Sequence, residues 1–435
     1  MSTQSKYSAR TGIALVIANM VGTGVFTSLG FQLLEIQSTF VIFMLWLIGG
    51  VLALCGALTY AELASRSPRS GGEYHFLSEL YHPCVGFVSG WVSLTVGFAA
   101  PTALAAMTFA AYFDSAVGDS LPINRNILAI TLVAFITFVH GRNRHKSADL
   151  QNWFTGIKVV LIIGYLAIIF FLAKQPQAIS LYPLRGDSAT ILSGSFAVAL
   201  IYVNYAYTGW NAATYITGEI DSPETNIPRV LITGTSIVLL LYLALNLSFL
   251  YAAPVETLAG KIEIGIIAVE HQFGQWAAGT MGAVLSILLI STISAMLMAG
   301  PRVLQMMGED YPVFTVFSKL NDGGVPQRAI YLQGALAIAL ILSSTFDSIL
   351  VFSGFILGLS SLATVLSIFM LRRKTKGLGK GYRVLAYPFP PLIYAGVMIW
   401  TLCFISINRP QEAVVALGIL FLGAAAYFIC KSKEV

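Results

Sequence analysis

The fold of this chain is decided by Gly22-Thr23-Gly24-Val25-Phe26, a glycine-rich stretch in the middle of its first long apolar run. Glycine costs about 1 kcal/mol relative to alanine inside a helix, so such a stretch predicts a break in the span. A second stretch, Tyr205-Ala206-Tyr207-Thr208-Gly209-Trp210, lies in the middle of the sixth apolar run. Interrupted spans at corresponding positions of two halves are typical of inverted-repeat transporters with a binding site at the membrane midplane. The alternative is that both stretches are faces of small residues through which intact helices pack.

The composition indicates that these stretches belong to a membrane protein. Of the 435 residues, 57% are hydrophobic and only 10% are charged, whereas soluble domains carry roughly 25% charged residues. A membrane-spanning helix needs about 20 apolar residues, so this apolar content suffices for about twelve spans. The composition excludes an ordinary cytosolic enzyme and predicts one polytopic domain over residues 1–435.

The apolar runs between polar breaks predict an all-α membrane protein with twelve transmembrane helices. The runs do not alternate between apolar and polar residues, which excludes a membrane-spanning barrel. The predicted spans are at about 12–34, 38–65, 84–113, 126–140, 150–173, 189–217, 230–252, 273–307, 329–345, 347–371, 387–407 and 411–430.

Basic residues predict the orientation of these spans, because Lys and Arg accumulate in cytoplasmic loops. With a cytoplasmic N-terminus, most of the 25 basic residues lie inside. They are Lys6, Arg10, Arg66, Arg69, Arg142, Arg144, Lys146, Arg229, Arg302, Lys319, Arg328, Arg372, Arg373, Lys374, Lys376, Lys380, Arg383, Lys431 and Lys433. Those left outside are Arg125, Lys174, Arg185, Lys261 and Arg409. We therefore predict a multi-pass protein with both termini in the cytoplasm. The cluster from Arg372 to Arg383 could also bind anionic lipid. The net charge of +5 is a sign of topology and does not indicate a nucleic-acid partner.

The sequence carries no motif of a membrane enzyme or a metal site. The cysteines fall in or beside apolar runs without a C-x-x-C pair, so neither a metal site nor a disulfide framework is predicted. H-E-x-x-H, G-x-S-x-G and P-loop motifs are absent from the sequence, and the first-span glycines do not match G-x-G-x-x-G. A channel would need a continuous polar pore, which two broken helices do not favour. We expect no enzymatic activity and no cofactor.

A series of motifs resembles the amino acid-polyamine-organocation (APC) superfamily of transporters. The stretch from Gly22 to Phe26 is similar to the G-S/T-G-I/V-F of that family. Further similarities, in the same order along the chain, are Tyr60-Ala61-Glu62-Leu63, Pro68, Ser70-Gly71-Gly72-Glu73-Tyr74, Gly90-Trp91, Ala206 to Asn211, Glu219-Ile220, Pro223-Glu224, Asn226-Ile227-Pro228-Arg229, and Tyr382-Arg383 with Pro388 and Pro391. The resemblance covers about residues 10–400, and the sixth-span stretch is most similar to the L-type amino acid transporter branch and its bacterial relatives.

The resemblance implies a LeuT-like fold, in which helices 1 to 5 and 6 to 10 form inverted repeats with helices 1 and 6 broken. The repeats would cover about 12–173 and about 189–371, with two peripheral helices at about 387–430. No cysteine lies in a predicted outer loop, so we expect no disulfide-linked heavy chain of the kind that animal members bind. A stand-alone transporter of the inner (plasma) membrane is the prediction.

The broken helices predict how a neutral amino acid could be bound without a charged side chain. Backbone N–H groups of Thr23, Gly24 and Val25, at the positive end of a half-helix, would hold the carboxylate. Glycine would let the substrate approach the backbone closely. The resemblance implies that the ammonium rests on nearby carbonyl groups. The predicted binding residues are Met20, Val21, Gly22, Thr23, Gly24, Val25, Tyr205, Ala206, Thr208, Gly209 and Asn211. The alternative for each of these residues is plain helix packing.

Two further roles follow for Tyr205 and Asn211. The resemblance implies that Tyr205 is an aromatic lid over the bound substrate, although such a residue could also be ordinary packing. The uncharged Asn211 is consistent with neutral substrates.

Lys158 is the one ionisable residue well inside a predicted span, which makes it a candidate for function. The resemblance implies that its ammonium occupies the place of the sodium ion of sodium-coupled relatives and bridges helix 1 to helix 5. It would carry a proton if it deprotonates and would act as a fixed cation if it does not. The alternative is that the side chain extends toward the cytoplasm.

Four charged residues at the cytoplasmic ends of helices 2 and 6 could form an inner gate of ion pairs. They are Glu62, Glu219, Asp221 and Arg229. Charges at helix ends are also common as simple anchors.

The sequence thus predicts sodium-independent transport of neutral L-amino acids by alternating access, most directly as exchange. Proton-coupled symport and an amino acid sensor on a transporter scaffold are the alternatives. The preferred amino acid, the direction of net flux, the oligomeric state and the protonation of Lys158 stay open.

Overall fold

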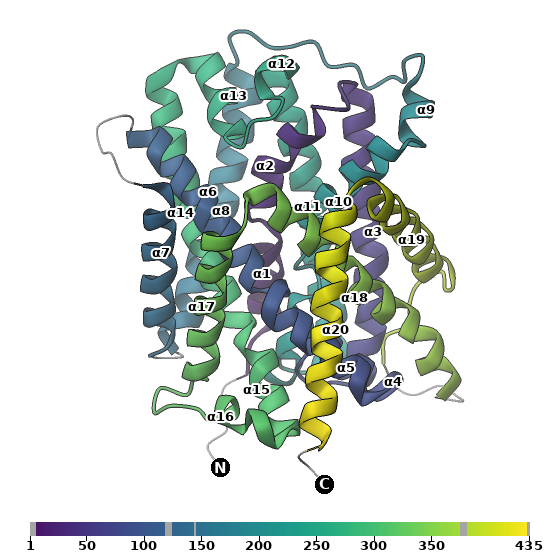
Figure 1. The fold of residues 1–435 in the computed structure, drawn as a ribbon. Coiled ribbons are helices and arrows are strands. Elements are labelled where there is room, and N and C mark those ends of the chain that lie inside the picture. The colour runs from purple at the N-terminus through teal and green to yellow at the C-terminus, as the bar shows by residue number, and fades with distance from the viewer. Residues whose placement is uncertain (1–5, 118–123, 143–144, 375–380, 433–435) are drawn as a thin grey trace.

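The structure is a bundle of long helices lying side by side (Figure 1). It is a computed structural model that describes residues 6–117, 124–142, 145–374 and 381–432. Within these ranges the chain forms helices and a single isolated bridge between Tyr7 and Ile220, without a strand. We call the end of the bundle where α1 begins and α20 ends the terminal end. Helices α9, α12 and α13 lie at the opposite end. The prediction of an all-α membrane protein is confirmed.

Twelve spans can be followed through the described residues. Those of the first half are α1 (Ala9–Met20) with α2 (Thr23–Gln32), α3 (Thr39–Arg66), α5 (Pro83–Val92) with η1 (Ser93–Gly97) and α6 (Ala99–Val117), α7 (Arg125–His140) and α8 (His145–Leu172). Those that follow are α10 (Gly194–Tyr207) with η3 (Ala212–Glu219), α11 (Pro223–Ala252), α14 (Gln275–Ala299) with α15 (Pro301–Asp310), α17 (Gln327–Ser343), α18 (Phe346–Lys374), α19 (Phe389–Asn408) and α20 (Pro410–Ser432). Nine of these are long and apolar enough to cross a membrane, α7 and α17 are shorter apolar helices, and the α10–η3 span is divided into two short pieces.

Both predicted breaks are present. The first span is interrupted between Met20 and Thr23, and the sixth between Tyr207 and Ala212. At the second break, Gly209 has a φ of +101°, a left-handed conformation that glycine adopts without the steric cost of a Cβ atom. The two broken spans run in opposite directions, because α1 rises from the terminal end while α10 descends toward it (Figure 1). Because both spans are interrupted, the alternative of two intact helices packed through small residues is wrong.

The predicted spans differ from the observed ones where local geometry changes within an apolar run. The third span contains a π-helical turn, η1, and the eighth is divided at Gly300 because Pro301 begins a new helix. The sixth begins only at Gly194, after the separate short helix α9 (Asp187–Ile191). The helices that the sequence did not predict are short: α4 (Glu73–Leu80), α12 (Val255–Leu258), α13 (Ile264–Phe273), η4 (Pro312–Phe314) and α16 (Thr315–Ser318).

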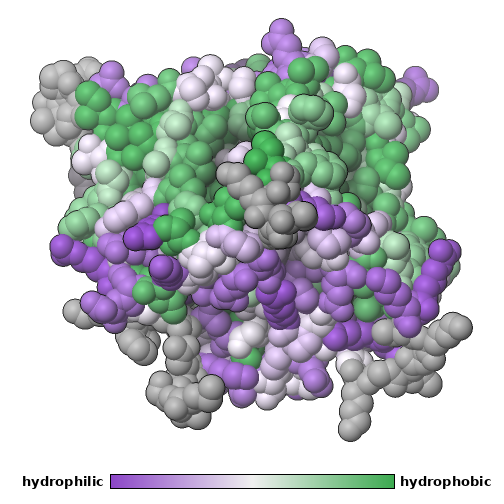
Figure 2. All heavy atoms as spheres, turned by 60° about the horizontal axis from the view of Figure 1, so that its bottom comes forward, coloured by the Kyte–Doolittle hydropathy of each residue, from purple (hydrophilic) through white to green (hydrophobic). Residues whose placement is uncertain are grey.

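The surface of the bundle fits a membrane environment. Figure 2 shows hydrophilic residues gathered over the terminal end and hydrophobic residues around the sides. Large apolar side chains such as Phe171 on α8 and Phe421 on α20 are exposed. Of the residues assigned to the cytoplasm from sequence, Arg144, Lys376, Lys380 and Lys433 lie outside the described residues.

Candidate functional site

The two broken helices pack directly against each other. A Cβ atom at Gly24 would lie 2.5 Å from Cα and 2.6 Å from Cβ of Ala206, a residue of α10. A Cβ atom at Gly209 would lie 2.8 to 3.0 Å from main-chain and Cβ atoms of Asn19 in α1. The face of Gly24 is thus filled by Ala206, so in this conformation the glycine permits contact between helices. This differs from the predicted close approach of a substrate to that face.

The start of α2 offers unoccupied backbone donors. Its N-cap is Gly22, and no described side chain caps the helix. The first N–H groups of an α-helix have no partner within the helix, and they carry the positive end of its dipole. Thr23, Gly24 and Val25 supply these groups and are buried. These donors are of the kind that binds a carboxylate.

The predicted carbonyl acceptors are already engaged by protein donors. The Met20 carbonyl accepts from the Gly22 N–H at 2.8 Å and from the Tyr242 hydroxyl. The Tyr205 carbonyl accepts from the N–H and the hydroxyl of Thr208, at 3.0 and 2.6 Å. A carbonyl oxygen has two lone pairs, so an ammonium bound at these atoms has to displace or share a present donor.

Lys158 lies at the first break, buried within the protein. Its Nζ donates to the Val21 carbonyl at 2.8 Å and to the Thr292 hydroxyl at 3.0 Å. The Thr292 hydroxyl also reaches the Val21 carbonyl, at 3.3 Å. The side chain is 1% exposed, so the alternative of a side chain that extends toward the terminal end is wrong. The ammonium joins α8 to the break of the first span and to α14.

The space around the breaks is small and partly polar. A cavity of about 50 Å³ is lined by Asn19, Thr208, Gly209, Asn211 and Glu73 among others. The Oδ1 atom of Asn19 and the hydroxyl of Tyr205 are buried and have no hydrogen-bond partner among the described residues. Buried polar groups are normally paired, so unpaired ones beside two helix breaks favour a binding site for a polar ligand.

The four predicted gate residues do not form one cluster. Glu62 is fully buried and pairs with Arg372 of α18, whose Nε and Nη2 atoms donate to its two oxygens at 3.0 and 2.6 Å. It also pairs with Arg66, at 3.2 Å. Glu219 lies 3.6 Å from Arg302 of α15. Apart from Arg66, which lies one turn on in the same helix as Glu62, the partners of these two acids come from other helices, which a single sequence does not reveal.

Asp221 and Arg229, the other two predicted gate residues, are exposed. No ion pair of either residue is found in the described part of the chain. Main-chain atoms instead join this segment to the start of the first span. The Tyr7 N–H donates to the Glu219 carbonyl at 2.7 Å, and the Asp221 N–H donates to the Tyr7 carbonyl at 2.9 Å. A further tie at the terminal end joins Asp310 to Arg69 at 2.7 Å and to the Tyr74 hydroxyl at 2.6 Å.

Comparison with known proteins identifies the family of this chain. A family model described as amino acid permease matches residues 8–425 of the chain. The chain belongs to this family. Its members are transporters and not enzymes, so this permease is a membrane protein for amino acid transport.

The permease is similar to several curated transporters over almost its whole length. It is 25% identical to the serine/threonine exchanger SteT of Bacillus subtilis (strain 168) over 426 residues, 97% of this chain and 96% of that protein. It is 26% identical to the b(0,+)-type amino acid transporter 1 of Mus musculus over 439 residues, 98% of this chain and 88% of the relative. The Asc-type amino acid transporter 1 of Mus musculus is 24% identical over 428 residues, 95% of this chain and 79% of the relative.

Replacing Tyr205 of the permease tests its predicted lid role. The ring is buried and the hydroxyl has no described partner, so Tyr205→Phe should leave both thermal stability and amino acid transport close to wild type. Tyr205→Ala should raise the substrate concentration for half-maximal transport about twofold to tenfold, because stacking of an aromatic ring is worth about 0.5–1.5 kcal/mol. Tyr207→Phe is the matched control for removal of a hydroxyl that does have a partner. The Tyr207 hydroxyl donates to the Trp46 carbonyl at 3.2 Å, so its loss should lower thermal stability. Unchanged half-saturation in Tyr205→Ala would contradict the lid.

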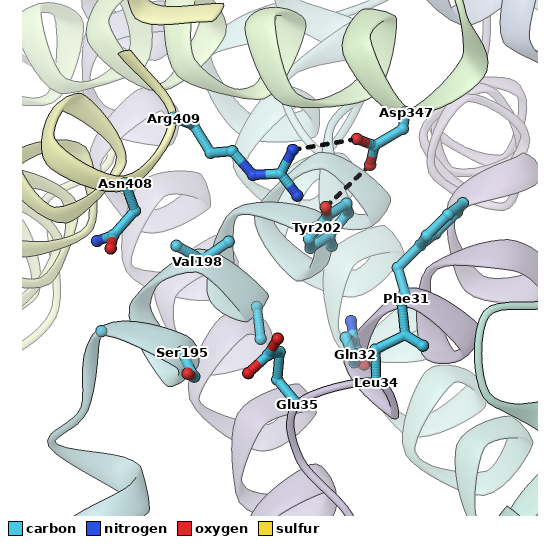
Figure 3. A pocket seen from close by; sticks show the side chains of 12 residues that line it. Phe31, Gln32, Leu34, Glu35, Ser195, Val198, Tyr202, Asp347, Asn408 and Arg409 are labelled. Atoms are coloured by element: carbon cyan, nitrogen blue, oxygen red, sulfur yellow. Dashed lines mark hydrogen bonds and ion pairs between the residues drawn. The ribbon is translucent and has the colours of Figure 1, made fainter. Parts of the chain in front are cut away.

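A wider pocket of the permease, of about 520 Å³, lies where α2 ends and α10 and α18 begin (Figure 3). Arg409 lies 3.4 Å from Asp347, whose other oxygen accepts from the Tyr202 hydroxyl at 2.9 Å. Phe31 of α2 stacks on Tyr202 with ring centroids 5.8 Å apart. Phe31 follows Gly24 along α2, and Tyr202 precedes Ala206 along α10. The stacked rings therefore lie nearer the pocket than the contact between Gly24 and Ala206 does. The permease is therefore more open on the side away from the termini than at the breaks.

Sequence reasoning missed Glu73 as a residue of the site. Glu73 begins α4, is 3% exposed and accepts a hydrogen bond from Asn211 at the second break. Burial raises the pKa of its carboxyl above the ordinary value, and the hydrogen bonds that it accepts oppose this effect. The signal in the sequence is an acidic residue directly after two glycines, which by itself does not distinguish a site residue from a helix start.

Proposed function

We propose that this permease exchanges neutral L-amino acids across the cytoplasmic membrane by alternating access, without sodium. The observation that carries the proposal is the ammonium of Lys158, which bonds to the Val21 carbonyl at the break of the first span. Carbonyl and hydroxyl oxygens are the ligands that hard cations prefer. The ammonium of Lys158 is a cation that the chain itself holds among such oxygens, so transport does not need a free cation such as sodium at this place.

The binding residues of this proposal are those of the two breaks. The carboxylate binds the backbone N–H groups at the start of α2, and the ammonium lies near the carbonyls of Met20, Val21, Tyr205 and Thr208 after exchange of their present donors. The side chain of the substrate lies toward the second break. Asn19 and Asn211, which line the cavity there, are uncharged, and the acidic Glu73 of the same lining is already held by protein donors, in keeping with neutral substrates.

The orientation in the membrane is also part of the proposal. The terminal end carries basic residues such as Arg66, Arg69 and Arg302, and such residues accumulate in the cytoplasm. Both termini are then cytoplasmic, and the pocket lined by Arg409 and Asp347 faces outward. The main-chain pairing of Tyr7 with Glu219 and Asp221 closes the cytoplasmic side. The permease works without a disulfide-linked heavy chain, since its four cysteines are Cys55, Cys84, Cys403 and Cys430, all within or beside spans.

Transport into proteoliposomes tests the proposal. A mixture of radiolabelled neutral amino acids is offered to vesicles that are empty or loaded with unlabelled amino acids, with and without an inward proton gradient, always without sodium. We expect uptake that depends on internal amino acid and not on the gradient. Gradient-driven uptake into empty vesicles would replace exchange with proton symport, and binding without uptake would point to a sensor.

A further inference from the structure

Glu73 is a buried acidic group that the proposed exchange mechanism does not use. Its Oε1 accepts from the Tyr60 hydroxyl at 2.6 Å, from Nδ2 of Asn211 at 3.1 Å and from the Ser361 hydroxyl at 3.2 Å. Its Oε2 accepts from the Ser360 hydroxyl. These donors belong to α3, to the second break and to α18. The carboxylate therefore ties α4 to three elements at once.

No positive charge compensates this carboxylate in the described part of the chain. The titratable groups that face it are Tyr60 from α3, Tyr215 from η3 and Tyr394 from α19. Tyr74 and His75, the next residues of α4, are engaged elsewhere, by Asp310 and by Ser67 with Glu79. A carboxylate buried among neutral groups binds a proton more readily than one in water.

Glu73 also lies beside a space, next to the second break, that is large enough for water. It lines the cavity of about 50 Å³ together with Asn19, Thr208 and Asn211. A cavity of about 10–15 Å³ or more suffices for one water molecule when polar partners are present. A water molecule held in this cavity would lie beside both Glu73 and the second break.

Protonation weakens the hydrogen bonds by which Glu73 holds its donors. An ionised carboxylate only accepts, with about four lone-pair sites for its four donors. A neutral carboxyl has a carbonyl oxygen with two lone pairs and a hydroxyl that donates. Ser360 can accept that proton and turn its own hydroxyl toward Ser89, which lies at 3.1 Å. Oε1 loses its share of the negative charge, and hydrogen bonds to a neutral oxygen are roughly half as strong as those to an ionised one. The longest bonds, from Asn211 and Ser361, are the first to be lost.

We propose that Glu73 is a proton-binding site of this permease, and that its protonation releases Asn211 and Ser361 so that η3 and α18 move away from α4. By linkage, the factor by which protonation favours separation of these elements is also the factor by which separation raises the affinity of Glu73 for the proton. The proton can bind and leave on one side of the membrane, so exchange without net proton transport is retained. The inference deepens the proposed function and rests on it for the transport arm of its test.

The first arm measures exchange in proteoliposomes between about pH 5 and about pH 8 at equal pH on both sides. Exchange by wild type should rise by roughly threefold or more toward acidic pH, as protonation of Glu73 favours opening. Glu73→Gln is neutral at every pH, so its exchange rate should be high and should not change with pH. Glu79→Gln is the matched control on the same helix, because the Glu79 side chain is half exposed and should leave the wild-type profile intact. A Glu73→Gln profile equal to that of wild type would overturn the proposal.

The second arm does not need transport. The thermal unfolding midpoint of wild type relative to Glu73→Gln is measured in detergent over the same pH range. A carboxyl whose pKa is raised by folding binds more protons in the folded state, so wild type should lose stability relative to the variant as pH rises. A constant difference would overturn proton binding. If no neutral amino acid is exchanged by any variant, the proposed function fails, and the pH dependence of this difference still decides whether Glu73 binds a proton.

Discussion

Exchange is abolished, or reduced about a hundredfold, when Gly24 is replaced by alanine. The new Cβ atom would lie 2.5 Å from Cα of Ala206, a backbone atom that cannot move aside alone. Helices α2 and α10 have to separate, and overpacking of this kind costs about 1–3 kcal/mol. Displacing binding groups by about 1 Å can reduce a rate about a hundredfold. Initial rates of exchange in proteoliposomes, at equal amounts of folded protein, measure the effect.

Two companion variants show whether the cause is the close packing of the broken helices. Gly164→Ala on α8 is the matched control, because its Cβ would meet no atom within 4 Å and exchange should be unchanged. Combining Gly24→Ala with Ala206→Gly removes the Cβ atom of Ala206 but leaves its backbone in place, so we expect little recovery. Normal exchange by Gly24→Ala would mean that the spacing of α2 and α10 is not needed for transport.

Exchange falls roughly tenfold to a hundredfold when Lys158 is replaced by alanine. The substitution removes the donor to the Val21 carbonyl and the Thr292 hydroxyl, both buried. Leaving such groups without their partner costs about 1–3 kcal/mol. The break of the first span then loses its link to α8. Exchange rates and thermal stability, each measured with and without sodium, record the result.

The role of the charge is separated from that of the hydrogen bonds by Lys158→Gln, a neutral side chain that can still donate. We expect it to recover only a small part of the activity. Lys174→Ala, just after the end of α8, is the control, since Lys174 is exposed and should be dispensable. Wild-type exchange by Lys158→Gln would refute a fixed cation, whereas recovery of Lys158→Ala by added sodium would support it.

The breaks could be predicted from sequence because their cause is local. Glycine beside a small polar residue disfavours a helix, and Gly22 beside Thr23 and Gly209 beside Thr208 do lie at interruptions. The spans were predictable for the same reason, since an apolar run of sufficient length has few alternatives in a bilayer. Lys158 was singled out because an ionisable residue inside such a run is rare.

The partners of the site residues could not be predicted, because they depend on residues far apart along the chain. Nothing in the neighbourhood of Glu62 indicates Arg372, which pairs with it from a helix three hundred residues away. The burial of Glu73 depends on α3 and α18, which enclose α4 only after folding. A charge near the end of a span looks the same in sequence whether it faces water or a neighbouring helix.

The pairing of Tyr7 with Glu219 and Asp221 is made by main-chain atoms alone. This pairing requires an N–H at position 7, which excludes proline, but it does not otherwise depend on the side chain there, so other substitutions can accumulate while the pairing persists. Alignments of related transporters would therefore show a variable position at a place of mechanical importance. For anyone engineering this protein, the start of the first span is a poor site for an insertion or a rigid fusion, however permissive its residues look.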